Sequence, residues 1–324
     1  MNALITIAKK EYTDAIRNAL FLTLAGFLLA LVGISILVAS LDFNTQVAQY
    51  TAAFAQLSSA QALGAVLSAP QYFPLQMLRG TIEYLEIIGA IIAIVLGYLS
   101  IAKEKGTNTS RLLLTRPVNR FSFMGGKILG NSALLLSLIS VIFVFILFGI
   151  SGIGHVLFSG SELTKLVLTM LATYVYLTFF YCFSAALTLL MRDLPRALML
   201  AFSLWLVFVL IIPQVGDTMD PDNQVPGGFF ASMHVTQDQQ AQIIGKFRRY
   251  EDLRNTLEII SIEKHYERFA FAMLGIKLTY NNKPLGIILQ DKWPNVALLV
   301  IFYSVSIALA FIFASNRRIM ASSP

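Results

Sequence analysis

Residues 19–41 read ALFLTLAGFLLALVGISILVASL, a run of 23 residues without a charged side chain. Fourteen of them are Leu, Ile, Val or Phe. A helix that spans a bilayer needs about 17–25 mostly apolar residues, and each of these four residue types favours insertion by about 0.3–0.6 kcal/mol at the helix centre. The run is therefore expected to be a transmembrane helix, which places the chain among integral membrane proteins.

Five further stretches share this composition, and each is long enough to span a bilayer once its flanks are added. They are residues 87–102, 128–153, 166–191, 197–212 and 296–315. Only 13% of the 324 residues are charged, whereas a soluble domain carries about 25%. The sequence predicts an all-α, multi-pass protein of the cell membrane (plasma or inner membrane) with six transmembrane helices.

The distribution of Lys and Arg between the short connections predicts the orientation of the spans. Thirteen flank the spans on one side of the membrane, and only two lie in the short connections of the other side. Because cytoplasmic loops carry the excess of basic residues, both termini are expected in the cytoplasm. The thirteen are Lys9, Lys10, Arg17, Lys103, Lys105, Arg111, Arg116, Arg120, Lys127, Arg192, Arg196, Arg317 and Arg318, and the two are Arg79 and Lys165.

The chain is expected to divide into four parts: residues 1–18, spans one to five over 19–212, an outer segment 213–292, and a sixth span with a cytoplasmic tail over 293–324. The outer segment is long enough to be translocated whatever its charge. From 236 to 274 apolar residues recur at spacings of three and four, which predicts helix and a small extracytoplasmic helical cap. The recurring positions are Ile243, Phe247, Tyr250, Leu253, Leu257 and Ile260.

Residues 4–18 predict an amphipathic helix that lies in the membrane interface before the first span. Ile5, Ala8, Tyr12 and Ala15 with Ile16 share one face, and the charged side chains Lys9, Lys10, Asp14 and Arg17 point away from it. A solvated N-terminal extension is the alternative. The positions of this helix expected to matter for function are Lys9, Lys10, Glu11 and Arg17.

The most informative connection is the cytoplasmic loop 103–127, which with three following residues reads KEKGTNTSRLLLTRPVNRFSFMGGKILG. Gly106 can end the helix of the second span, Pro117 begins a new element, and Gly126 with Gly130 forms a GxxxG step at the entry to the third span. Leu112, Leu113 and Leu114 form an exposed apolar patch, which favours a partner protein surface. Insertion of the three leucines into the lipid interface is the alternative.

With these motifs, the chain resembles an ABC transporter permease of the ABC-2 type. The resemblance rests on KKEYTDAIRN before the first span, K-E-x-G-T after the second, then LLL-x-x-PVNR and G-GK-x-x-G. The layout is most similar to NosY-like permeases, which are associated with nitrous-oxide-reductase maturation. A helix-rich outer loop that contains LEIISIEKHYERF also fits that group.

The resemblance implies that two permease chains pair, as copies or with a sister chain, and that each docks one subunit of a cytoplasmic ABC ATPase dimer. Docking would use the interfacial helix and the 103–127 coupling loop, with Leu112–Leu114 as the docking knobs. Glu104 would contact the ATPase or the interfacial helix. The remaining docking positions are Gly106, Arg116, Pro117 and Arg120.

The chain is not expected to be an enzyme by itself, and no catalytic residue is assigned. The phosphate-binding pattern GxxxxGK[ST] does not occur, since Gly126–Lys127 and Gly245–Lys246 lack the required neighbours. ATP and Mg²⁺ would be bound by the partner ATPase, and no cofactor is expected in this chain. One alternative is a mechanical transmitter that acts on an extracytoplasmic protein at 213–292 without solute flux. Another is an ATP-independent carrier or membrane enzyme.

Tyr174, Thr178, Tyr181 and Thr188 follow one face of the fourth span. They could line a polar pathway, but packing between helices is the favoured interpretation. No carboxylate, histidine or basic residue falls inside the six stretches, and Glu83 with Glu86 is expected to be a solvated helix start.

Neither a metal site nor nucleic-acid binding is expected. His155, His234 and His265 lack ligand spacing, and the basic residues border the membrane spans. Asp217, Asp220 and Asp222 favour turns over calcium binding. Ser261 and His265 share a helix face but are expected at the surface of the cap.

Overall fold

The computed structural model describes residues 2–59, 73–106, 119–219, 229, 233, 235–281 and 283–314. Within these ranges every regular element is helical, and six helices are long and apolar enough to cross a membrane. The predicted all-α chain with six spans is confirmed to that extent. Some residues with predicted roles lie outside the described ranges, namely Leu112, Leu113, Leu114, Arg116, Pro117, Asp220, Asp222 and His234.

The first span is α2 (Ala19–Ser59), and the second combines η1 (Pro74–Leu78), α3 (Arg79–Tyr84), a π-helical turn η2 (Leu85–Gly89) and α4 (Ala90–Gly106). The third is α6 (Arg120–Gly152) and the fourth α7 (Gly160–Leu190). The fifth joins α8 (Leu194–Trp205), π-helical η3 (Leu206–Ile211) and α9 (Ile212–Met219), and the sixth is α14 (Leu285–Phe313). The other elements are α1 (Asn2–Ile16), α11 (Gln237–Lys246), α12 (Arg248–Ile260), α13 (Ile262–Met273) and η5 (Leu278–Tyr280).

Several helices begin at side chains that satisfy their free N–H groups. Ser159 and Glu162 form a capping box at the start of α7, Asp193 accepts a hydrogen bond from the backbone N–H of Arg196, and Asn119 accepts one from Phe121. Such caps contribute about 0.5–2 kcal/mol each. The short polar connections in the sequence therefore determine where these helices start.

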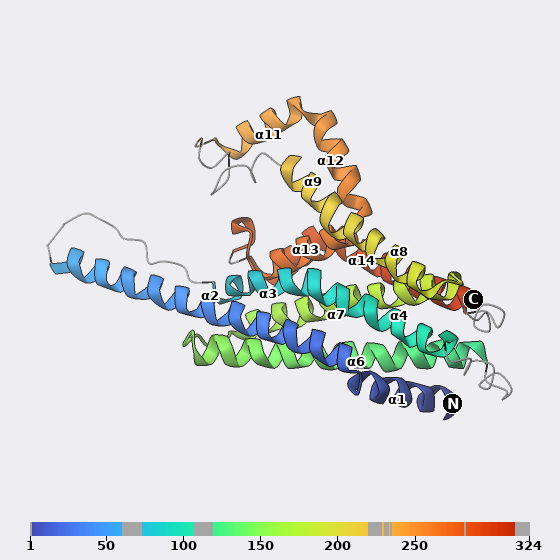
Figure 1. The fold of residues 1–324 in the computed structure, drawn as a ribbon. Helices are drawn as coiled ribbons and strands as arrows, with labels where there is room; N and C mark the ends of the chain where they lie inside the picture. The colour runs from blue at the N-terminus through green and yellow to red at the C-terminus, as the bar shows by residue number, and fades with distance from the viewer. Residues whose placement is uncertain are drawn as a thin grey trace.

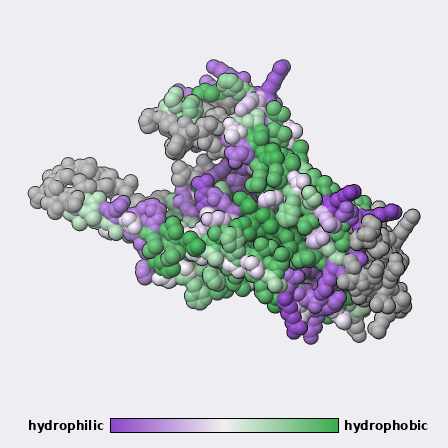
Figure 2. Space-filling model, in the orientation of Figure 1, coloured by the Kyte–Doolittle hydropathy of each residue, from purple (hydrophilic) through white to green (hydrophobic). Residues whose placement is uncertain are grey.

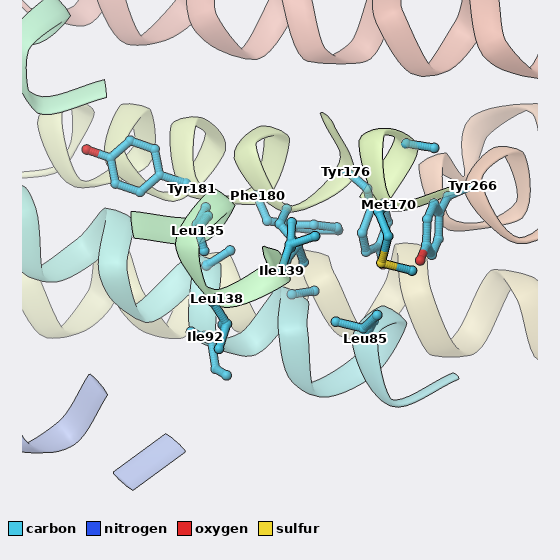
Figure 3. Packing of buried hydrophobic residues seen from close by; sticks show 14 of the residues in the cluster. Leu85, Ile92, Leu135, Leu138, Ile139, Met170, Tyr176, Phe180, Tyr181 and Tyr266 are labelled. Atoms are coloured by element: carbon cyan, nitrogen blue, oxygen red, sulfur yellow. The ribbon is translucent and has the colours of Figure 1, made fainter. Parts of the chain in front are cut away.

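The helix α7 lies at the centre of the bundle and packs against α4 and α14 most extensively. Figure 3 shows its Tyr176, Phe180 and Tyr181 among apolar side chains of the neighbouring helices. Gly97 of α4 allows the close approach, because a Cβ there would lie 3.0 Å from the Cβ of Ser184. The hydroxyl of Ser184 in turn donates to the carbonyl of Ile94 at 2.8 Å.

The outer helices expose apolar side chains around this core. Examples are Phe27 and Val38 of α2, Met199 of α8 and Ile312 of α14. Figure 2 shows the resulting green belt over the bundle, with purple surface at the lower right where α1 lies. A contiguous apolar belt of this kind is the surface that a bilayer covers. The localisation in a membrane is thus supported by the distribution of side chains as well as by helix length.

Figure 1 shows α1 and the end of α14 at the same end of the bundle, which we call the α1 end. In Figure 1 the helices α9, α11 and α12 project upward from the bundle, away from α1. The helix α13 lies beneath them and packs against α14 and α7. We call this the cap end. The helix α2 continues well past its charge-free stretch, because residues 42–59 contain no Gly or Pro and are rich in Ala and Gln.

The region 236–274 is helical as predicted, but it breaks at Phe247 and Ser261 into three helices. Phe247 and Leu253 on the predicted apolar face are exposed. The prediction that Ser261 and His265 lie at the surface is wrong, because both are buried. The hydroxyl of Ser261 donates to the carbonyl of Phe208 at 2.5 Å, and His265 lies 3.1 Å from the amide oxygen of Asn295.

The predicted solvated helix start holds for Glu83 and is wrong for Glu86. Glu83 is half-exposed and accepts a hydrogen bond from Arg79. Glu86 is only 6% exposed, because α13 packs over this part of the second span. Asp217 also departs from the predicted turn, since it belongs to α9 and pairs with Lys264 at 2.9 Å.

Candidate functional site

The helix α1 packs along the first half of α6 through the GxxxG step. A Cβ on Gly126 would lie 2.7 Å from the Cβ of Ile7 and 2.9 Å from the carbonyl oxygen of Leu4. A Cβ on Gly130 would lie 2.9 Å from the Cβ of Glu11 and closer still to the carbonyl oxygen of Ala8. The two glycines therefore form the surface on which α1 rests, which is how small residues allow close helix packing.

This packing turns Glu11 of α1 toward the bundle, where it is buried. Ile5 and Ile16 of the predicted apolar face are exposed on the surface of the protein. Glu11 lies three residues after Ala8 and four before Ala15, so it shares their helix face. The charged Lys9 and Arg17 are exposed, as predicted.

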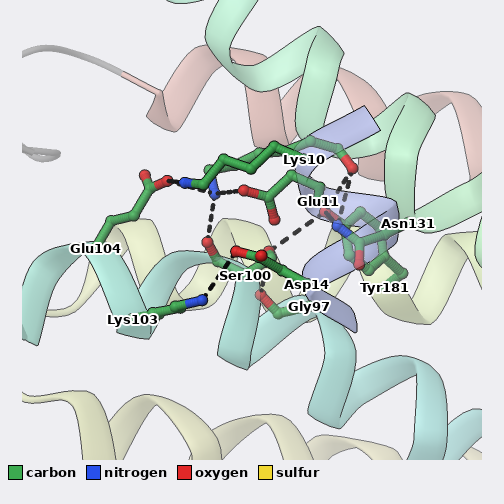
Figure 4. A network of polar contacts seen from close by, with 10 residues as sticks. Lys10, Glu11, Asp14, Gly97, Ser100, Lys103, Glu104, Asn131 and Tyr181 are labelled. Carbon is green, nitrogen blue, oxygen red and sulfur yellow. Dashed lines mark hydrogen bonds and ion pairs between the residues drawn. The ribbon is translucent and has the colours of Figure 1, made fainter. Parts of the chain in front are cut away.

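Lys127 of α6 is completely buried and is the centre of a group of polar contacts. Figure 4 shows its partners Glu11, Ser100 and Glu104. Its ammonium group donates to Glu11 at 2.8 Å and to the backbone carbonyl of Ser100 at 2.6 Å. It also pairs with Glu104 at 3.0 Å. Glu104 and Lys127 lie on the two sides of the 103–127 loop, so the ion pair joins the base of the loop.

Two further side chains connect this group to α7. The amide of Asn131 donates to the Lys127 carbonyl at 3.0 Å and lies 3.2 Å from the Tyr181 hydroxyl. The Tyr181 hydroxyl lies 3.3 Å from that of Ser100. The connected set, which we call the junction, is Glu11, Ser100, Glu104, Lys127, Asn131 and Tyr181.

Ion pairs at the rim of the junction link α1 to the end of α4. Lys103 donates to Asp14 at 2.9 Å, and Lys10 lies 3.8 Å from Glu104. The hydrogen bond from Lys103 lowers the pKa of Asp14. Both Lys103 and Asp14 are substantially exposed, and exposed pairs contribute at most about 1 kcal/mol. The buried contacts of Lys127 therefore matter more for holding α1.

Lys105 fixes the end of α4 to the end of α7. It is 3% exposed, and its ammonium group donates to the carbonyls of Thr188, Leu189 and Met191 at 2.7, 3.1 and 3.0 Å. These carbonyls end α7 and lack partners within the helix. A cation at a helix C-terminus is also stabilised by the helix dipole. The loop thus begins at a helix end that is attached to the central helix.

The other predicted docking positions within the described residues lie at the ends of the loop. Gly106 is the last residue of α4, and Arg120 is the first of α6, where it is exposed and its guanidinium lies 5.0 Å from the Phe121 ring centre. Glu104 contacts Lys127 of α6 and Lys10 of α1, the helix predicted to lie in the membrane interface. Its second carboxylate oxygen is buried without a hydrogen bond from the described residues.

The predicted pathway stripe lies inside the bundle. Thr178, Tyr181 and Thr188 are buried, and only Tyr174 is partly exposed. The Thr188 hydroxyl donates to the carbonyl of Ser184 in its own helix. This placement is typical of residues that pack helices together.

Sequence reasoning missed Lys127, Ser100 and Asn131 as parts of the site. Lys127 serves to predict the orientation of the spans and belongs to the family motif, but no contact is predicted for it, although its place between Gly126 and Gly130 is a usable signal. A helix that packs on Gly126 and Gly130 lies within reach of the long side chain at position 127. No comparable signal identifies Ser100, because its contacts depend on how α4, α6 and α7 meet.

A second group of buried charges lies at the cap end, where Glu263 is beside Glu86 and Lys264. Burial raises the pKa of Glu263 to about 8. The positive charge of Lys264 lowers this pKa, whereas the negative charges of Glu267 and Asp217 raise it. The carboxyl therefore holds a proton in the folded protein at neutral pH, while the unfolded chain releases it above about 4.5. The contribution of Glu263 to the free energy of unfolding must then fall as the pH rises from about 4.5 to about 8.

Replacing Glu263 with glutamine is expected to remove this pH dependence. The thermal unfolding midpoint of the purified protein should fall from pH 5 to pH 8 more steeply in the wild type than in Glu263→Gln. Glu83→Gln, which changes an exposed carboxylate at the same end, should keep the wild-type slope. Parallel curves for all three proteins would show that Glu263 titrates normally.

In the described part of the chain, no three His, Cys, Asp or Glu side chains are grouped as metal ligands would be. The expectation that this chain holds no metal or cofactor stays a prediction.

Comparison with known proteins assigns the chain to a family. The family model described as ABC-2 family transporter protein matches residues 5–318. No curated protein matches the chain. The matched range includes most of α1, the junction and all six candidate spans.

Proposed function

The chain belongs to the ABC-2 transporter family, and from that membership we propose that it is the transmembrane permease subunit that couples ATP hydrolysis by a separate cytoplasmic ATPase to export or conformational work across the membrane. The proposed partners are an ABC ATPase dimer, which binds ATP and Mg²⁺, and a second permease chain, either another copy or a sister. The most specific part of this proposal is that the chain is a NosY-like permease.

The observation that carries the proposal is the position of Lys127. It joins α1, the end of α4 and the start of α6 through Glu11, Ser100 and Glu104. Separating any of these elements would leave a buried charge without its partner, which costs about 3–5 kcal/mol. A force applied to the loop or to α1 would therefore move all three helices together.

The end of α4 extends this connection to the centre of the bundle. Because Lys105 holds the last carbonyls of α7, displacement of the loop would also reach the helix that contacts most others. Closure of an ATPase dimer against the α1 end would thus change the packing of the spans. In this proposal the α1 end faces the cytoplasm, which agrees with the positive-inside distribution.

A mechanical transmitter without solute flux is the second candidate. The observation that favours it is the exposure of apolar side chains on the cap, where Phe247, Leu253 and Ile260 are 61%, 54% and 48% exposed. Such residues suit contact with an extracytoplasmic protein. The two candidates differ in one measurement, because only a transporter shows ATP-dependent substrate flux in proteoliposomes.

Docking through the coupling loop can be tested with Leu112, Leu113 and Leu114 changed together to serine. We expect loss of co-purification with a co-expressed partner ABC ATPase, because the apolar side chains proposed to contact the partner are removed. Ile259→Ser with Ile260→Ser changes an exposed apolar pair on the cap and should leave ATPase recovery unchanged. Full recovery with the triple variant would contradict docking by these leucines.

A further inference from the structure

A groove of about 570 Å³ runs between α2 and the η1–α3 segment, away from the junction. Its walls change from apolar to polar along α2. Ile34 and Val38 line one part, and Asp42, Gln46, Gln76 and Arg79 line the other. The groove is therefore amphipathic along its length.

The apolar part of the groove faces the bilayer. Ile34 and Val38 are 58% and 60% exposed and belong to the charge-free stretch of the first span. Asp42 is the first charged residue after that stretch, about 12 Å further along the helix than Ile34 at 1.5 Å per residue. The polar part of the groove thus lies at the depth where lipid head groups begin.

The polar part holds one cation and one carboxylate. Arg79 donates to Glu83 at 2.9 Å and lies over the Phe271 ring, yet its side chain is 65% exposed. Asp42 accepts a hydrogen bond from Gln46 at 2.8 Å. An exposed ion pair such as Arg79–Glu83 is weak, so it leaves Arg79 able to bind another anion.

We propose that this groove binds a phospholipid whose head group carries a primary amine. The phosphate lies at Arg79, the ammonium group at Asp42, and one acyl chain along Ile34 and Val38. Both signs of charge in one groove complement a zwitterion, whereas an anionic lipid would leave Asp42 facing negative charge. A choline head group has no N–H to donate to Asp42. Lipid binding in this groove needs no ATPase, so its test is independent of the proposed function.

Native mass spectrometry of the purified chain in detergent tests the site directly. The probes are 1-palmitoyl-2-oleoyl lipids with ethanolamine, choline or glycerol head groups, each titrated separately. The wild type should retain the ethanolamine lipid at about tenfold lower concentration than the choline lipid, because one charge-assisted hydrogen bond contributes about 1.5 kcal/mol or more. Arg79→Gln should weaken retention of every phospholipid, and Asp42→Asn should remove the preference for ethanolamine over choline.

Arg196→Gln is the matched control, because it breaks an exposed ion pair with Asp193 at the α1 end. It should bind lipids like the wild type. Arg79→Lys keeps the charge and should restore part of the binding, and unfolding midpoints verify that each variant is folded. Equal retention of ethanolamine and choline lipids, tighter binding of the glycerol lipid, or a change of oligomeric state in Arg79→Gln without lipid dependence would each overturn the proposal.

Discussion

Replacing Lys127 with methionine is expected to lower the free energy of unfolding by about 3–5 kcal/mol, because it leaves two buried carboxylates without their cation. Methionine keeps the volume of the side chain but cannot donate to Glu11, Glu104 or the Ser100 carbonyl. Thermal unfolding of the purified chain measures the loss. In complex with its ATPase, the variant should also lose any ATP-dependent change in trypsin cleavage at Lys246, Arg248 and Arg249 of the cap.

Two further variants separate stability from coupling. Lys103→Met removes an exposed pair with Asp14 and should cost less than about 1 kcal/mol. Combining Lys127→Met with Glu11→Gln and Glu104→Gln removes the uncompensated charges and should recover much of the stability, but not the ATP-dependent change at the cap. A Lys127→Met protein as stable as Lys103→Met would show that the junction is not important for stability.

The second large effect is expected from Gly130→Leu, which should separate α1 from α6. Even a Cβ at this position would overlap the α1 backbone at Ala8 and approach Glu11, so a leucine cannot be accommodated without displacing the helix. Once displaced, α1 should be cut rapidly by trypsin at Lys9, Lys10 and Arg17. Gel analysis of a digestion time course measures this.

Gly26→Leu is the control for Gly130→Leu, because it makes the same change in α2 where nothing lies within 4 Å of the new Cβ. Leucine is a better helix former than glycine by about 0.5–1 kcal/mol. The control should therefore digest no faster than the wild type. Equal digestion rates for the two variants would contradict the packing of α1 on Gly130.

The sequence alone predicts the six spans well, because bilayer insertion depends on local composition that a charge-free run displays directly. It predicts the elements of the candidate site less well. Glu11 was recognised as part of the N-terminal helix, but its burial depends on Lys127, which is 116 residues away. A buried charge becomes acceptable only through its partner, and no local pattern contains both members.

The helix α13 illustrates the same limit. Its sequence IEKHYERFAFAM has the polar content of a surface helix, yet Lys264 and His265 are buried. Lys264 pairs with Asp217 and Glu267, and His265 contacts Asn295. Contacts to two other helices thus make the interior suitable for charged residues. Only the folded arrangement reveals which charges are compensated in this way.

The length of α2 has a mechanical consequence. Its 41 residues extend about 60 Å at 1.5 Å per residue, about twice the 30 Å thickness of the hydrocarbon core. The part from Asp42 onward is a lever arm about 27 Å long. A 10° tilt of the span would move the far end of that arm by about 5 Å, so a small rotation inside the membrane becomes a displacement outside it larger than the diameter of a water molecule.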